Sequence, residues 1–248
     1  MPVDFLNRFM DQYWEHLLLL HWPVEKESIM QTLPDDLQVD LFDKQAWVSV
    51  VGFKLSGLRI SPVRWIKWPD FWEINLRTYV KDRSGKKGIW FYSLDSSDIF
   101  AVTGARLLYG LDYNFANTFG AASGENISFI SERKFPHRKA KSAFSGKIKS
   151  SEDSVNFVSS ALDKFLLERY RFWTKRKHAC RSETGCVRHI PYKAIKVSKP
   201  KYSGELFTSQ GMIEPQNDAC IGHYCRGMSV QATAPSWAFS MAGQANQM

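Results

Sequence analysis

The 248-residue sequence predicts a mainly β fold of the α+β class, with an antiparallel β core and a few short helices. Many segments alternate apolar and polar residues and are joined by connections of hairpin length, whereas only a few segments show helical spacing. No Pro-, Gly- or Ser-rich linker divides the chain, and β-rich domains of this length are commonly undivided. We therefore expect one domain over residues 1–237, followed by a flexible C-terminal tail over residues 238–248.

The composition, with 44% hydrophobic and 14% aromatic residues, is sufficient for a large core and excludes a disordered chain. The net charge of +8 is uneven, because residues 133–201 contain 19 Lys/Arg and 5 Asp/Glu, a balance of +14. Four cysteines indicate a reducing compartment rather than a disulfide framework. Acidic residues near the N-terminus and an apolar run of only four residues, 17–20, predict neither a secretory signal nor a membrane span. We expect a cytoplasmic protein without a membrane partner.

The N-terminal part of the chain is predicted to form two helices and a hairpin. Phe5, Phe9, Tyr13 and Leu17 recur at a spacing of four, which indicates an amphipathic helix over residues 5–20. A short helix is expected over residues 25–32. Alternation over residues 38–42 and 46–60 predicts a hairpin of two strands.

The central stretch contains the most unusual strand. Glu73, Asn75, Arg77 and Tyr79 alternate with apolar residues, so these four side chains share one face of the strand. A turn at Gly85 leads to a second strand, GIWFYSL, and a helix is expected from residues 95–97 to about residue 110. The polar face of the first strand either meets water or lines a polar cavity.

The second half of the chain is predicted to consist mostly of strands. A capping box formed by Ser160 and Asp163 predicts the start of a short helix, and residues 204–211 are expected to form a helical turn. The expected strands cover residues 113–119, 127–135, 139–149, 171–178, 187–197 and 224–232.

The first candidate site combines Glu73, Asn75 and Arg77 with Arg106 on the following helix. A carboxylate near guanidinium groups inside a barrel suits the binding of a polar or carboxylated small molecule. The alternative is a structural Arg–Glu network that closes one end of the barrel.

Three further interpretations are weaker. His189, in the segment RHIPY, is a second candidate acid or base, although a lone strand histidine is more often structural. The spacings of the four cysteines and the nearby histidines do not match zinc motifs, so we expect no metal and no cofactor. Basic residues interleaved with aromatic residues over 169–177 have the composition of a nucleic-acid surface, so binding of nucleic acid or another anionic partner by the basic face from Arg133 to Lys201 is the alternative function. No nucleotide-binding or nucleophile-elbow motif is present.

Seven motifs occur in an order that resembles the YqjF-like family of bacterial proteins of unknown function. The motifs read HWPVEKESIMQTLPDDLQVDLFDKQAWVSVVGFKL, FWEINLRTYV, GIWFYSLDSS, AR-x-x-YGLDY, FLLERYRFW, RHIPY and GHYCRGMSV, and the resemblance as a whole runs from about Trp14 to Trp237. This family is similar to the acetoacetate decarboxylase-like superfamily. The resemblance implies a closed antiparallel β-barrel or cone with a central cavity, which periodicity alone does not indicate.

The same resemblance bears on chemistry. In the decarboxylases a strand glutamate and a Gly-x-Pro-Lys-Lys segment supply the acid and the Schiff-base lysine; Glu73 matches the glutamate, and the lysine segment falls on residues 110–114. Tyr113 and Asn114 occupy the two lysine positions. Since tyrosine has no amine, it forms no imine, and Schiff-base decarboxylation is not expected. Tyr113 instead acts as a hydrogen-bond donor.

From these residues we expect a protein that binds a small polar or anionic molecule, such as a carboxylate, in a β-cone cavity. Arg77 and Arg106 would attract the anion. Glu73 and Asn75 would fix its orientation, and Tyr113 would donate a hydrogen bond. If the protein is an enzyme, Glu73 and His189 are its acid/base residues. The sequence leaves open whether a reaction occurs and whether the protein forms a homo-oligomer.

Overall fold

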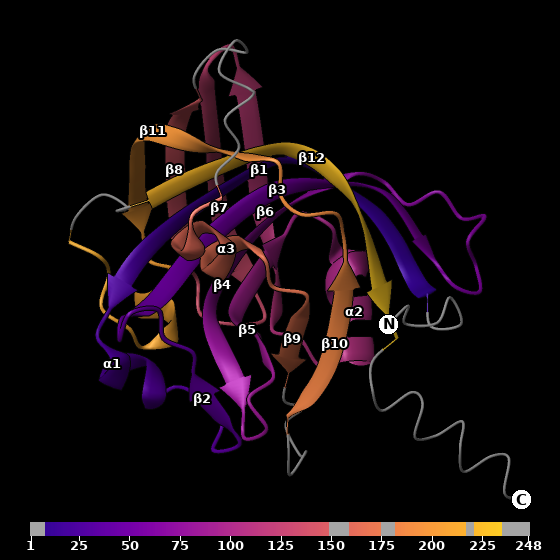
Figure 1. Cartoon of the computed structure of the whole chain (residues 1–248). Helices are drawn as coiled ribbons and strands as arrows, with labels where there is room; N and C mark the ends of the chain where they lie inside the picture. The colour runs from indigo at the N-terminus through magenta and orange to yellow at the C-terminus, as the bar shows by residue number, and fades with distance from the viewer. Residues whose placement is uncertain (1–7, 149–158, 175–181, 217–220, 235–248) are drawn as a thin grey trace, which may run out of the picture.

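The computed structural model describes residues 8–148, 159–174, 182–216 and 221–234. Within these residues, 12 strands form one curved sheet that closes on itself through additional strand pairings (Figure 1). No helix in this part of the chain is long and apolar enough to cross a membrane. The predicted tail over residues 238–248 lies outside the described residues.

The elements follow one another along the chain with short connections. They are β1 (Arg8–Val24), α1 (Lys26–Met30), β2 (Leu37–Val39), β3 (Ala46–Ile60), β4 (Phe71–Asp82), β5 (Lys87–Ser96), α2 (Ile99–Tyr109), β6 (Tyr113–Ser123), β7 (Asn126–Phe135), β8 (Lys141–Ile148), α3 (Ala161–Leu167), β9 (Arg171–Thr174), β10 (Glu183–Arg188), β11 (Ala194–Gly204), the 3₁₀ helix η3 (Thr208–Gln210) and β12 (Ile221–Thr233).

The sheet closes twice, and this double closure creates two interiors. A 9-strand barrel runs β5-β6-β7-β8-β11-β12-β1-β3-β4 and returns to β5. A second ring uses β12, β1, β3, β4 and β5 again and closes through β9 and β10, because β10 pairs with β12 and β9 pairs with β5. The predicted closed barrel is therefore confirmed. Its pairs are antiparallel except β5–β6, which is parallel because α2 carries the chain across between these strands.

The strands shared by the two rings bury both faces. Leu18 and Leu20 of β1 face the barrel interior with the aromatic rings of Phe129 and Phe144, whereas Leu17 and Leu19 face the second ring. All four leucines have no exposed surface. Alternating polar residues are consequently not required here, which explains the continuous apolar run over residues 17–20 of β1.

The predicted helix over residues 5–20 is wrong, since residues 8–24 form strand β1. A spacing of four is compatible with the strand period of two as well as with the helical period. A bulge between Glu15 and Leu18, where His16 has a positive φ of 54°, interrupts the alternation that would have indicated the strand.

Two other predicted pairings also differ from the structure. The predicted hairpin is wrong: β3 has the expected bounds but pairs with β1 and β4, while β2 pairs with β4. The strand predicted over residues 187–197 is two strands, β10 and β11. Pro191 lies in the unpaired segment between them, because proline has no N–H for the ladder.

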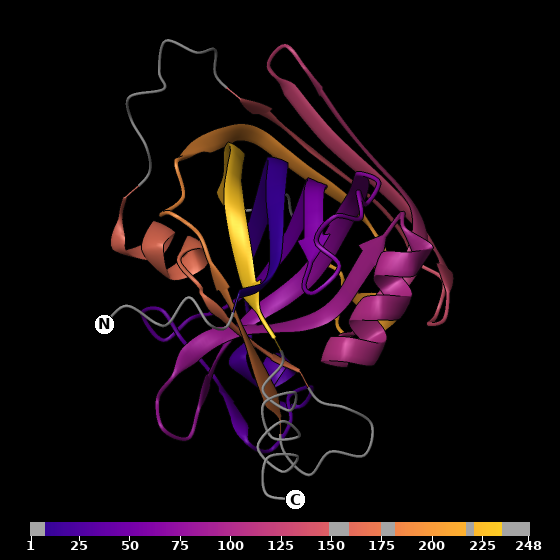
Figure 2. The ribbon, with the colours of Figure 1, turned by 90° about the vertical axis from the view of Figure 1, so that its right-hand side faces the viewer.

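The two longer helices lie near their predicted positions, but α2 starts later than expected because residues 95 and 96 belong to β5. Asp98 caps α2 by accepting a hydrogen bond from the backbone N–H of Ala101, and Gly110 ends it with a left-handed φ of 64°. Ser160 and Asp163 form the predicted capping box of α3. In Figure 2, α3 in salmon and α2 in magenta flank the shared strands on opposite sides.

Candidate functional site

A cavity of about 150 Å³ lies inside the second ring, beneath α2. Its walls are mostly apolar and aromatic, and α2 presents the small residues Gly104 and Ala105 to it. The charged, amide, imidazole and tyrosine side chains that line it are Gln12, Glu73, Asn75, Arg77, Tyr109, Tyr113, Arg169, Arg171, His189 and Tyr192. A few polar groups within an apolar cavity are typical of small-molecule sites.

Glu73 is the cavity's carboxyl group and is almost fully buried, with 3% of its surface exposed. Its Oε1 accepts a hydrogen bond from Asn75 Nδ2 at 3.0 Å, and its Oε2 accepts one from the Tyr113 hydroxyl at 2.9 Å. Burial raises the pKa of Glu73 from 4.5 to about 7, because desolvation outweighs these two hydrogen bonds, and the charge of Asp95 adds to the rise. The group is therefore able both to donate and to accept a proton near neutral pH.

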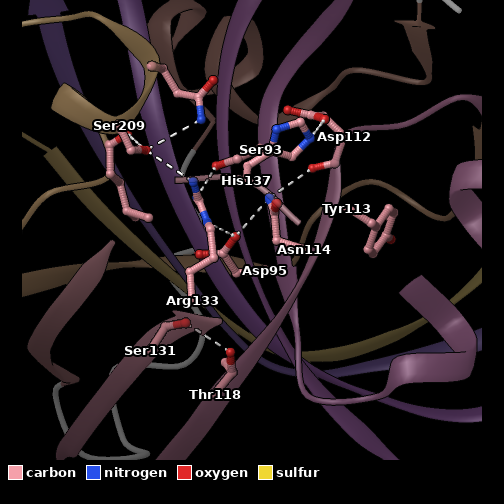
Figure 3. A network of polar contacts seen from close by, with 12 residues as sticks. Ser93, Asp95, Asp112, Tyr113, Asn114, Thr118, Ser131, Arg133, His137 and Ser209 are labelled. Carbon is pink, nitrogen blue, oxygen red and sulfur yellow. Dashed lines mark hydrogen bonds and ion pairs between the residues drawn. The ribbon is translucent and has the colours of Figure 1, made fainter. Parts of the chain in front are cut away.

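Tyr113 begins β6 and reaches the cavity because successive side chains of a strand point to opposite faces. Figure 3 shows Tyr113 pointing away from the polar network that its neighbour Asn114 joins. Burial raises the pKa of Tyr113 well above its usual value of 10.0, and the nearby Glu73 carboxylate raises it further. Tyr113 thus retains its proton and donates it in a hydrogen bond to Glu73.

Arg77 places a cation in the cavity without an acidic partner. Its side chain is buried, and Nη2 donates to the backbone oxygen of Leu166 at 3.3 Å. Its Nε is buried and has no hydrogen-bond partner, and the Oδ1 of Asn75 is in the same state. Among the described residues, no carboxylate forms an ion pair with Arg77. Buried charges are normally paired, so this guanidinium lacks a counter-ion that a ligand can supply.

The prediction that Arg106 joins this site is corrected, because Arg106 does not line the cavity. Its Nη1 donates to the backbone oxygen of Tyr113 at 2.7 Å and lies 3.5 Å from Asp112 Oδ1. His137 Nε2 lies 3.2 Å from Arg106 Nη1 and 2.6 Å from Asp112 Oδ1, and all three side chains are partly exposed. The α2 residues that line the cavity are instead Phe100, Ala101, Gly104, Ala105, Leu108 and Tyr109.

His189 lines the cavity at the end of β10, and no hydrogen bond joins it to Glu73 within the described structure. Its ring packs between Tyr170 and Tyr192, with centroid distances of 4.7 Å and 4.9 Å. Nδ1 lies 2.8 Å from the backbone oxygen of Ile190 and therefore carries the proton. Burial lowers the pKa of His189, which leaves a neutral imidazole.

A buried chain of polar groups was not predicted from the sequence; its last member, Tyr79, donates to the same Leu166 carbonyl oxygen as Arg77. Asp163 Oδ1 lies 3.0 Å from His223 Nε2, and His223 Nδ1 lies 3.0 Å from His21 Nε2. His21 Nδ1 lies 2.7 Å from the Ser49 hydroxyl, which lies 2.7 Å from the Tyr79 hydroxyl. Burial lowers the pKa of both histidines. His21 lies opposite Ser49 because β1 pairs with β3. Since the sequence predicted a helix in place of β1, this strand pairing and its contacts were not expected.

The predicted metal ligands and the predicted basic face lie only partly within the described residues. The described residues contain no group of three or more metal-ligating side chains, and Cys186 and Cys225 are free thiols; Cys180, Cys220 and His178 lie outside them. The predicted basic face from Arg133 to Lys201 is wrong at two positions, where the basic side chain is buried. Arg133 has no exposed surface, and Arg169 is 7% exposed, so neither belongs to a surface. Residues 175–177 lie outside the described residues.

The fold is similar to that of acetoacetate decarboxylase-like proteins. It matches the acetoacetate decarboxylase of Legionella pneumophila with a TM-score of 0.61 at 10% identity, over 94% of this chain and 90% of that one. It matches the enduracididine biosynthesis enzyme MppR, complexed with pyruvate, with a TM-score of 0.57 at 12% identity, over 94% and 91% of the two chains. At these identities the similarity concerns the fold alone.

The chain belongs to the DUF2071 family of uncharacterized conserved proteins, whose family model matches residues 11–229. It is 31% identical to the uncharacterized protein YqjF of Bacillus subtilis over 222 residues, which are 89% of each chain. The family resemblance carried by the seven sequence motifs is therefore confirmed.

Proposed function

We propose that this protein binds a small organic anion, a carboxylate with a compact apolar body, in the cavity of the second ring. The observation that carries this proposal is the buried guanidinium of Arg77, which has no acidic partner among the described residues. A carboxylate would accept the unused Nε–H and neutralise the charge. The unpaired Oδ1 of Asn75 would accept a hydrogen bond from a ligand hydroxyl or amine.

The apolar walls and the small volume support a compact ligand rather than a long or highly charged one. The neighbour MppR is complexed with pyruvate, which is a small carboxylate. The described residues that line the cavity include no lysine, so a Schiff-base mechanism has no nucleophile there. If a reaction occurs, Glu73 is the proton donor and acceptor, held by Asn75 and Tyr113.

Arg77→Met is expected to weaken binding of a carboxylate ligand by about 10- to 100-fold, since a hydrogen bond to a charged group contributes roughly 1.5–3 kcal/mol. The measurement is a thermal-shift screen of small hydroxy, keto and simple carboxylic acids, followed by calorimetric titration of each hit.

Arg106→Met is the matched control, because it removes the same charge from a position outside the cavity. Binding in this variant should equal that of the wild type. Equal losses in both variants would contradict the cavity site, and so would a complete absence of stabilising carboxylates.

A further inference from the structure

A second hollow, of about 700 Å³, lies beside the cavity between α3, β9 and β10. We call it the basic groove. Arg169, Arg171 and Val187 line both the groove and the cavity, so the two hollows share a wall. Its size is within the range of small-molecule pockets, whereas a general basic surface needs no hollow.

The described side chains that line the basic groove are strongly cationic. They comprise five cationic residues and one acidic residue, Glu168, so the net charge of the lining is +4. The cations are Lys87, Lys164, Arg169, Arg171 and Arg188.

The acids near the groove are already engaged. Asp40 accepts from buried Arg169 at 2.8 Å and lies 3.4 Å from Lys87 Nζ, so it satisfies these two cations. Glu168 accepts a hydrogen bond from the backbone N–H of Tyr192 at 2.9 Å and another from the Tyr170 hydroxyl. Glu168 keeps its negative charge, but neither acid forms an ion pair with Lys164, Arg171 or Arg188 among the described residues.

Lys164, Arg171 and Arg188 are the cations that remain. Within the described residues, their side chains form no hydrogen bond or ion pair, although all three line the same groove. Arg171 and Arg188 lie on β9 and β10, which are paired strands, and Lys164 faces them from α3. Two guanidinium groups and an ammonium group around one hollow are the donor set that binds phosphate oxygens.

Aromatic side chains form the apolar part of the groove. Phe42, Phe165 and Tyr170 line it, and Tyr170 is 39% exposed. In contrast, Phe172 and Trp173 of the basic segment are 6% and 3% exposed, which leaves them unable to stack on the bases of a nucleic acid. The groove therefore fits a compact organic molecule better than a polynucleotide.

We propose that the basic groove binds a phosphorylated small molecule, with its phosphate between Lys164, Arg171 and Arg188 and its organic part against the aromatic residues. This site is independent of the carboxylate site at Arg77. The shared wall places a ligand of the groove next to the cavity.

The test is calorimetric titration with pyrophosphate at fixed ionic strength. The wild type should bind it saturably, and Lys164→Gln/Arg188→Gln should bind it at least about tenfold more weakly, because two charge-assisted contacts are lost. These two residues line the groove and not the cavity. Arg171→Gln should show a loss in the same direction, and thermal unfolding without ligand establishes that each variant folds.

Lys147→Gln/Lys201→Gln is the matched control, since it removes two exposed lysines that do not line the groove. It should bind pyrophosphate as the wild type does, and so should Arg77→Met, which separates this site from the carboxylate site. The proposal is overturned if the wild type shows no saturable binding or if both double variants lose affinity equally. It is also overturned if a single-stranded oligonucleotide binds more tightly than pyrophosphate.

Discussion

Arg133→Met is expected to lower the free energy of unfolding by about 3–5 kcal/mol, the typical effect of removing one partner from a buried ion pair. Arg133 and Asp95 have no exposed surface, and Arg133 Nε donates to Asp95 Oδ1 at 2.7 Å inside the 9-strand barrel (Figure 3). The guanidinium also donates to the hydroxyls of Ser93 and Ser209 at 2.9 Å and 3.2 Å. Its removal leaves the Asp95 carboxyl without its cation in an apolar interior. Denaturant unfolding followed by tryptophan fluorescence measures the loss.

The double variant Asp95→Leu/Arg133→Met is the control for this prediction. It removes both charges, so no buried carboxylate is left unpaired, and it should be more stable than Arg133→Met alone. If the double variant is instead the less stable of the two, the barrel depends on the other hydrogen bonds of Arg133 rather than on the ion pair.

The free energy of unfolding should fall by about 3 kcal/mol as the pH rises from 4.5 to 7, owing to Glu73. Its pKa is about 7 in the folded protein and near 4.5 when exposed, so between these values the folded state holds a proton that the unfolded state has released. The contribution of Glu73 to the free energy of unfolding is thus fully present below pH 4.5 and is lost as the pH rises through 7. Glu73→Gln cannot ionise and should lack this dependence, becoming more stable than the wild type at pH 8.

Glu125→Gln is the matched control, because Glu125 is exposed and its removal should leave the pH profile unchanged. Urea titrations of the three proteins at pH 4.5, 6 and 8 measure the effect. An unchanged profile in Glu73→Gln would show that Glu73 ionises normally and would remove its role as an acid/base near neutral pH. A gain in stability at pH 8 is the behaviour expected of a functional residue rather than of a structural one.

Local features of the sequence identified much of the fold and part of the site. The capping box of Ser160 and Asp163 marked the start of α3, because capping depends on neighbours only three residues away, whereas the N-cap of α2 is Asp98, just after the predicted residues 95–97. Alternation predicted β3 and β4 with nearly correct bounds and placed Glu73, Asn75 and Arg77 on one face. The motifs added the family, and the family added the closed barrel.

The sequence by itself therefore determined the class of fold, the family and the polar face of β4. Only the tertiary structure decided which strands pair, that the sheet closes twice and that the cavity lies in the second ring. It also excluded Arg106 from the cavity and joined His21 to His223, although 202 positions separate them in the chain. The physical reason is that periodicity and capping are local, whereas ring closure and side-chain contacts depend on packing between residues far apart in sequence.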